Sequence, residues 1–278
     1  MKYHVMSAHG PMFRLLAIHS VGQVHSLHPR AVNLLFGDTL LTLVMPDRGN
    51  GPGNLVCVDQ APFTALGWTS QDPVWAADGA IYGPGGHTVR WAGAAHWEPP
   101  LPPPTADPAV LRENRDRLAD ALSQYGNHAG LLPAALAVAG GTAPQTSLSQ
   151  FAGPRVQALM AGDPDGARGL IGLGPGLTPS GDDLLAGYAV TLHRAGRPTT
   201  LLGNLAPNAT TLVSWHLLRW ADRGLAGEHA LTLTDGILSQ SGHAALAALG
   251  RVLAHGATSG SDWAAGALLA LIHLTWEA

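Results

Sequence analysis

The sequence predicts an α+β protein with a β-rich N-terminal domain followed by an all-helical C-terminal domain. Runs typical of strands lie in the first hundred residues, and helical periods separated by glycine and proline begin at Pro108. Between them, residues 99–104 are five prolines and one leucine, which can continue neither a sheet nor a helix. The predicted organisation is therefore a domain over residues 1–98, a linker over 99–107 and a helical domain over 108–278.

The predicted strands are short runs of β-branched and large apolar residues. In chain order they cover residues 13–18, 32–36, 40–44, 55–58 and 88–92. Gly37-Asp38 separates the second and third runs and predicts a hairpin turn there. A second turn is expected over residues 83–86, which read Gly-Pro-Gly-Gly.

The predicted helices follow one another without an intervening strand. They cover residues 109–125, 131–139, 149–161, 182–194, 210–223, 228–240, 242–255 and 262–275. The apolar run 263–274 is too short to cross a bilayer, so it is read as a buried helix.

Composition narrows the classes of function. Of the 278 residues, 46% are hydrophobic and 12% charged, which is typical of a compact globular protein. The net charge of −4 provides no electrostatic footprint for nucleic acid. Cys57 is the only cysteine, which excludes a disulfide within the chain, and Lys2 is the only lysine, which excludes a Walker-type phosphate loop and internal Schiff-base chemistry. The first 14 residues carry no secretory signal, so we expect a cytoplasmic protein with no membrane role.

The most informative segment is residues 172–183, a run of glycine and proline that leads into an apolar helical run. Ser180 and Asp183 have the spacing of a capping box, which predicts a helix start near Gly181. Backbone N–H groups of the loop would then lie beside the positive end of a helix, as in anion sites. Because Asp182 adds a second acid, a metal-bridged anion or proton transfer suits the segment better than a bare phosphate. The structural alternative is a tight loop before a well-capped helix.

The frame Ser-Gly-x-Asp-x-x-Ala-Gly occurs twice, at residues 180–187 and 259–266. Each copy predicts a serine N-cap, an acid in the first turn and a glycine one turn further in. Close packing of Gly187 against Gly266 would bring both ends, with Asp183 and Asp262, to one cavity on the same side of the domain. The alternative is that the copies are two ordinary helix caps.

Two further groups of side chains are candidates. Thr210, Thr211 and Ser214 open another helix. Capping is the expected role of any single one of these hydroxyls, and the alternative is that the group adds donors to an anion pocket. The 14 histidines lack the spacing of a zinc site. A hard cation such as Mg²⁺, held by oxygens of Asp182, Asp183 or Asp262, fits the sequence better, although no residue requires a cofactor.

Residues 172–183 carry the unbroken pattern GLGPGLTPSGDD, and two later segments, 210–214 with Glu228 and 256–262, extend the match. With these segments the sequence resembles the AllH family, subunits of oxamate carbamoyltransferase. Leu184 stands where the family has phenylalanine, and Gly227 stands where it has a serine before the glutamate, which leaves the role of Glu228 open.

The resemblance implies transfer of a carbamoyl group between oxalurate and phosphate, giving oxamate and carbamoyl phosphate in purine and allantoin catabolism. It also implies at least two partner subunits and a small anionic substrate. The chemistry of the motif assigns oxyanion binding to Ser180, Ser259 and the amides of Gly174 and Gly176. Asp182 or Asp183 would act as base or hold a cation, and Asp262 would orient the second end.

The remaining candidates for the anion pocket are Thr178, Gly181, Thr210, Thr211, Ser214 and Gly260. Two other functions fit the same residues. In the first, the chain is a non-catalytic subunit that binds a small anion or acts as a scaffold. In the second, it is a stand-alone hydrolase or transferase that acts on an amide or carbamoyl compound.

Overall fold

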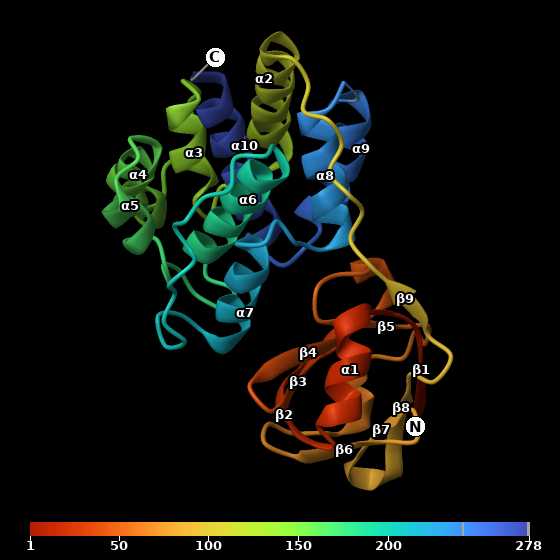
Figure 1. Cartoon of the computed structure of the whole chain (residues 1–278). Helices are drawn as coiled ribbons and strands as arrows, with labels where there is room; N and C mark the ends of the chain where they lie inside the picture. The colour runs from red at the N-terminus through yellow and green to blue at the C-terminus, as the bar shows by residue number, and fades with distance from the viewer. Residues whose placement is uncertain (241, 277–278) are drawn as a thin grey trace. The chain divides into compact units, whose positions relative to one another are not determined.

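A computed structural model describes residues 1–240 and 242–276, and the chain divides into two compact units, 1–100 and 101–278 (Figure 1). The strands of the described chain belong to the first unit, and from Pro108 onward its regular elements are helices. The predicted α+β class is confirmed. Residues 98–107, around the predicted Pro-rich linker, form neither helix nor strand.

The first unit contains one nine-stranded sheet in the order β5-β4-β3-β2-β6-β7-β8-β1-β9. Its strands are β1 (Lys2–His9), β2 (Val21–His28), β3 (Ala31–Phe36), β4 (Thr39–Val44), β5 (Asn54–Cys57), β6 (Pro73–Ala77), β7 (Ala80–Gly83), β8 (His87–Arg90) and β9 (Ala95–Trp97). Because β5 pairs with both β4 and β1, the sheet closes on itself. The predicted hairpin at Gly37-Asp38 joins β3 to β4, with Gly37 at a φ of 61°.

The predicted strand over residues 13–18 is wrong, because this segment belongs to helix α1 (Gly10–Ile18). Pro11 lies in the first turn, where proline favours a helix. Met12 and Leu16, four residues apart, are buried in the core of the unit, together with Val24, Leu34 and Ile81 from the sheet. Apart from Arg14 the run 13–18 is apolar, and in so short an apolar run the helical period cannot be told from that of a buried strand. Short 3-10 turns occur at Pro46–Arg48, Phe63–Leu66 and Pro84–Gly86.

The second unit is built from helices packed around a central pair. They are α2 (Pro108–Tyr125), α3 (Leu132–Val138), α4 (Ser147–Met160), α5 (Pro164–Arg168), α6 (Ser180–Arg194), α7 (Leu212–Ala221), α8 (Glu228–Leu238), α9 (Gly242–Leu253) and α10 (Ser259–Trp276). The prediction located all of these except the five-residue α5. No helix of the described chain has the length and apolar character needed to cross a membrane.

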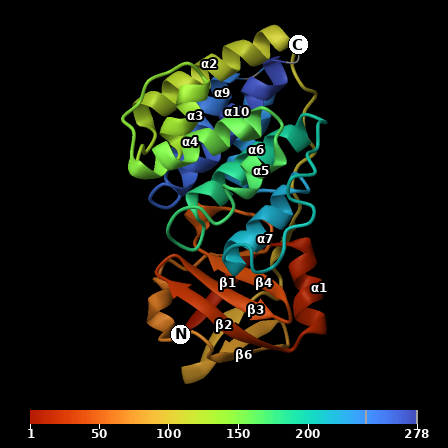
Figure 2. The same ribbon diagram turned by 90° about the vertical axis from the view of Figure 1, so that its left-hand side faces the viewer.

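The central pair is α6 and α10, which lie side by side in both views of the ribbon (Figure 2). A Cβ added to Gly187 would lie 1.9 Å from the backbone oxygen of Trp263, and one added to Gly266 would lie 1.9 Å from that of Leu184. Only glycine permits backbones to approach so closely. The predicted close packing at these two glycines is confirmed.

Candidate functional site

The loop before α6 depends on three glycines in left-handed backbone conformations. Gly172, Gly174 and Gly176 have φ angles of 72°, 119° and 97°. A Cβ on Gly176 would meet no atom within 4 Å, so glycine is needed there for its φ and not for space. Within the described part of the chain, the amides of Gly174 and Gly176 donate no hydrogen bond. These two N–H groups therefore remain available to a ligand.

Asp182 fixes this loop to the segment that precedes α7. Its carboxylate is fully buried, and one oxygen accepts a hydrogen bond of 2.8 Å from the Gly172 amide. The other oxygen accepts from the Thr210 hydroxyl. The neighbouring Thr211 donates to the Leu177 carbonyl and caps α7 by accepting from the Ser214 amide at 3.1 Å. Both Asp182 oxygens are thus engaged in holding the loop.

The predicted serine caps are wrong, because both helices begin one residue earlier than a cap would require. Ser180 is the first residue of α6, Pro179 precedes it at the cap, and no side chain caps this end. Ser259 is likewise the first residue of α10. The hydroxyls instead reach across the helix crossing, where each finds a partner on the opposite chain segment. Ser180 lies 3.4 Å from the Thr258 hydroxyl, and Ser259 lies 3.0 Å from that of Thr178.

The two first-turn acids share this crossed pattern. Side-chain hydrogen bonding couples Asp183 on α6 to Ser259 and Thr178, and Asp262 on α10 to Ser180 and Thr258. Each acid is thus bound by the serine of the opposite helix and by a threonine from its own approach. The two copies of the repeated frame pair with each other through their hydroxyls, a result that the sequence alone did not predict. We call Asp183, Asp262 and these four hydroxyl residues the acidic crossing.

Burial dominates the electrostatics of the acidic crossing. Asp183 is 5% exposed and Asp262 is 0% exposed. Burial raises the pKa of Asp183 well above its ordinary value; hydrogen bonds from Ser259 and Thr178 oppose the rise, whereas the charges of Asp262 and Asp182 add to it. Burial also raises the pKa of Asp262, to about 6, against hydrogen bonds from Ser180, Leu131 and other groups. Both carboxyls hold a proton more tightly than an exposed aspartate does.

Each of these acids retains one oxygen without a partner. The Oδ2 atoms of Asp183 and Asp262 are buried, and neither has a hydrogen-bond partner among the described residues. Asp262 Oδ1 accepts a bond of 2.6 Å from the Leu131 amide. A Cβ on Gly130 would lie 2.3 Å from the same oxygen, so a glycine is required beside the carboxylate. The sequence did not identify the Gly130-Leu131 segment before α3 as part of the site. Its glycine was the one feature of the sequence that could have indicated a close contact there.

Gly181 and Gly260 serve the packing of the helix starts. A Cβ on Gly181 would lie 1.9 Å from the Leu170 oxygen, and one on Gly260 would lie 1.9 Å from the Val252 oxygen. Their amides already donate to the carbonyls of Leu173 and His255. These contacts give both glycines a structural role. In α7, the buried hydroxyl of Ser214 has no partner within the described chain.

The arrangement of possible metal ligands bears on the Mg²⁺ ion that the sequence suggests. Across residues 1–240 and 242–276, no three His, Cys, Asp or Glu side chains are grouped as metal ligands. Asp182 is engaged by an amide and a hydroxyl, and the raised pKa of Asp183 favours its neutral form. The chemistry proposed below uses no metal ion.

Comparison with known proteins identifies both parts of the chain. A family model described as "Oxamate carbamoyltransferase subunit AllH" matches residues 170–271, which include the glycine loop and the acidic crossing. A second, described as "AllH family N-terminal domain", matches residues 4–96. No solved structure matches the chain.

Proposed function

Because the chain belongs to the AllH family, we propose that it is the AllH-type subunit of an oxamate carbamoyltransferase complex. In this proposal it acts with partner subunits in the cytoplasm. The complex converts oxalurate and phosphate into oxamate and carbamoyl phosphate, in purine and allantoin catabolism. The family name supports the role as a subunit of an oxamate carbamoyltransferase, and the reaction and pathway are proposed from the resemblance to this family.

One observation carries the proposal: an acid with a strongly raised pKa lies at the start of α6, directly after a loop with two unused amides. Burial raises the pKa of Asp183 well above its ordinary value and so favours the protonated carboxyl over the ionised one. A carboxylic acid kept neutral can donate a proton to a leaving group. The amides of Gly174 and Gly176, with the N-terminal ends of α6 and α10, supply donors for negative charge.

The proposed transfer uses both acids. A phosphate oxygen forms a bond to the carbamoyl carbon of oxalurate, and the bond from that carbon to the oxamate nitrogen breaks. The electron pair of the broken bond goes to the nitrogen, which takes the proton of Asp183. Asp262, with a pKa of about 6, accepts the proton that phosphate loses and returns it to Asp183. Ser180, Ser259 and Thr178 position the acids, and Asp182 holds the loop.

A second function is favoured by one observation, the near-complete burial of the acidic crossing. With Asp262 at 0% exposure, the pair can serve the fold alone while a partner subunit performs the chemistry. The chain would then bind a small anion at the glycine loop without transferring a group. The two functions differ in whether replacement of Asp183 changes turnover or only stability.

Reconstitution of the complex tests the proposed function. Purified partner subunits are assayed for carbamoyl phosphate formed from oxalurate and phosphate, with and without this chain. The proposal predicts a rate that rises with added chain and saturates at a fixed stoichiometry. A rate independent of the chain, in a mixture that assembles as shown by size-exclusion chromatography, would contradict it.

A further inference from the structure

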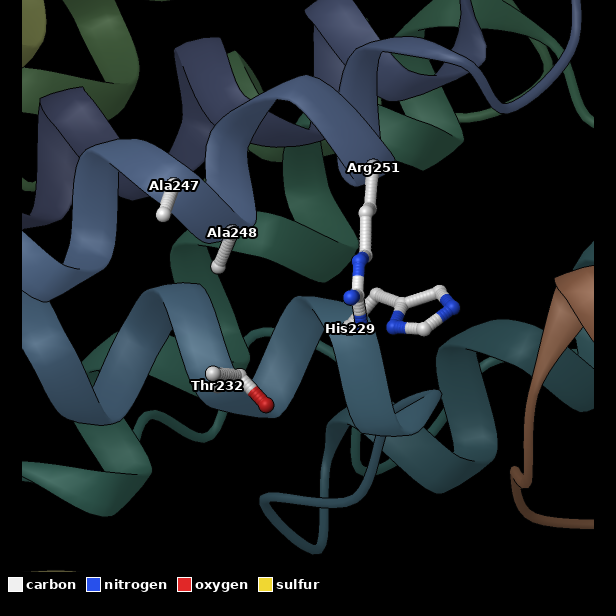
Figure 3. A pocket seen from close by; sticks show the side chains of 5 residues that line it. All are labelled: His229, Thr232, Ala247, Ala248 and Arg251. Atoms are coloured by element: carbon white, nitrogen blue, oxygen red, sulfur yellow. The ribbon is translucent and has the colours of Figure 1, made fainter.

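A pocket of about 220 Å³ lies between α8 and α9 and is lined by His229, Thr232, Ala247, Ala248 and Arg251 (Figure 3). A Cβ on Gly236 of α8 would lie 2.6 Å from the Cβ of Ala245 on α9, so the two helices touch at that point. The two helices run antiparallel from this contact. One turn away Thr232 on α8 faces Ala248 on α9, and about one turn further His229 faces Arg251. Two alanines on α9 leave the space between the helices open.

The pocket carries positive charge without a fixed negative charge. Arg251 forms no ion pair with any residue that the structure describes, and no acidic side chain lines the pocket. Figure 3 shows the Arg251 side chain extending from α9 toward α8, where His229 lies. The Thr232 hydroxyl donates to the Glu228 carbonyl at 2.7 Å, which leaves its oxygen as an acceptor only. Arg251 is therefore the fixed donor and fixed charge of the pocket.

We propose that this pocket binds a small organic monocarboxylate. The guanidinium fork of arginine matches a carboxylate through two parallel hydrogen bonds. The methyl groups of Ala247 and Ala248 form an apolar wall for the carbon body of the ligand. The volume lies below the range of about 300–1,000 Å³ of pockets for drug-sized ligands, so a compact acid fits. This site shares no residue with the acidic crossing, and it goes beyond the proposed function.

Binding to the whole chain is measured by isothermal titration calorimetry with butyrate and pyruvate at constant ionic strength. Inorganic phosphate tests for an anion without a carbon body, and 1-butanol tests for a carbon body without charge. We expect saturable binding of the two carboxylates and weaker binding of phosphate and butanol. Absence of saturable carboxylate binding, or phosphate as the tightest ligand, would overturn the proposal.

Three variants locate the binding. Arg251→Gln should raise the carboxylate Kd at least tenfold, which corresponds to about 1.4 kcal/mol. Ala247→Leu fills the apolar wall while it keeps the charge, and it should also weaken binding. Arg117→Gln, on α2, removes a positive charge elsewhere and should leave the Kd unchanged. An unchanged Kd in Arg251→Gln, or an equal loss in Arg117→Gln, would show that the ligand does not bind this pocket.

Discussion

Replacing Asp262 by asparagine should change how the free energy of unfolding depends on pH. Burial raises the Asp262 pKa from an ordinary 3.8 to about 6, so the folded state binds the proton more tightly than the unfolded state. Between these values the folded chain holds more protons, and its stability therefore falls as pH rises. A pKa difference of about two units between the folded and unfolded states corresponds to about 3 kcal/mol of unfolding free energy. The full value applies here because Asp262 has no exposed surface.

The stabilising effect of the Asp262 proton is complete below pH 4 and is lost as the pH rises through about 6. Asparagine at this position cannot ionise, and its side-chain oxygen can still accept from the Leu131 amide. Any cost of the substitution that does not depend on pH cancels when the two proteins are compared across pH. Relative to the wild type, the variant should gain about 3 kcal/mol between pH 4 and pH 7.

Urea unfolding followed by far-ultraviolet circular dichroism, at intervals from pH 4 to pH 8, measures this difference. Asp120→Asn on the exposed face of α2 removes an acid away from the acidic crossing and should not reproduce the gain. A difference between wild type and Asp262→Asn that is the same at every pH would refute the reasoning. It would mean that burial does not disfavour the ionised carboxylate.

Three further predictions follow from the helix crossing, the loop and the acids. Gly187→Ala should destabilise the chain by about 1–3 kcal/mol in urea unfolding, because its Cβ would meet the Trp263 oxygen. The control is Gly153→Ala, at a helical position with open space, which should stabilise the chain by up to about 1 kcal/mol. Equal effects of the two substitutions would contradict the close crossing. Phosphate or oxamate should raise the Tm of the wild type, and Gly176→Val should abolish the shift because valine opposes a φ of 97°; an unchanged shift in the folded variant would make the loop structural. Treatment with EDTA should leave the Tm unchanged, since the described residues offer no group of three metal ligands, and a lowered Tm would reveal a bound metal.

The helices of the second unit could be predicted from their punctuation and period, because glycine or proline follows most of the helical runs. Strands β1, β2, β6, β7 and β9 could not. In β2 only Val24 is fully buried, and its polar neighbours and two histidines conceal the pattern of a strand. The strand predicted over residues 13–18 was wrong for the opposite reason, since this short run, apolar except for Arg14, fits either period.

The candidate site could be predicted where a residue type by itself indicates the contact. The close approach at Gly187 and Gly266 followed from small residues at matching places in two helices. The direction of the hydroxyls did not, because Ser180 and Ser259 bind across the crossing in place of capping their own helices. Nor could the sequence place Leu131 beside Asp262, since this contact joins residues far apart in the chain.

The central claim is that Asp183 donates the proton in carbamoyl transfer, and the rate of the reconstituted complex with Asp183→Asn tests it most directly. Asparagine keeps the neutral charge of the protonated acid but cannot donate its proton in the same way. The account predicts that kcat for carbamoyl phosphate formation falls about a hundredfold or more, the usual contribution of general acid catalysis, while assembly and the KM for phosphate are preserved. A kcat equal to that of the wild type in an assembled complex would contradict the claim and leave the acidic crossing as a structural element.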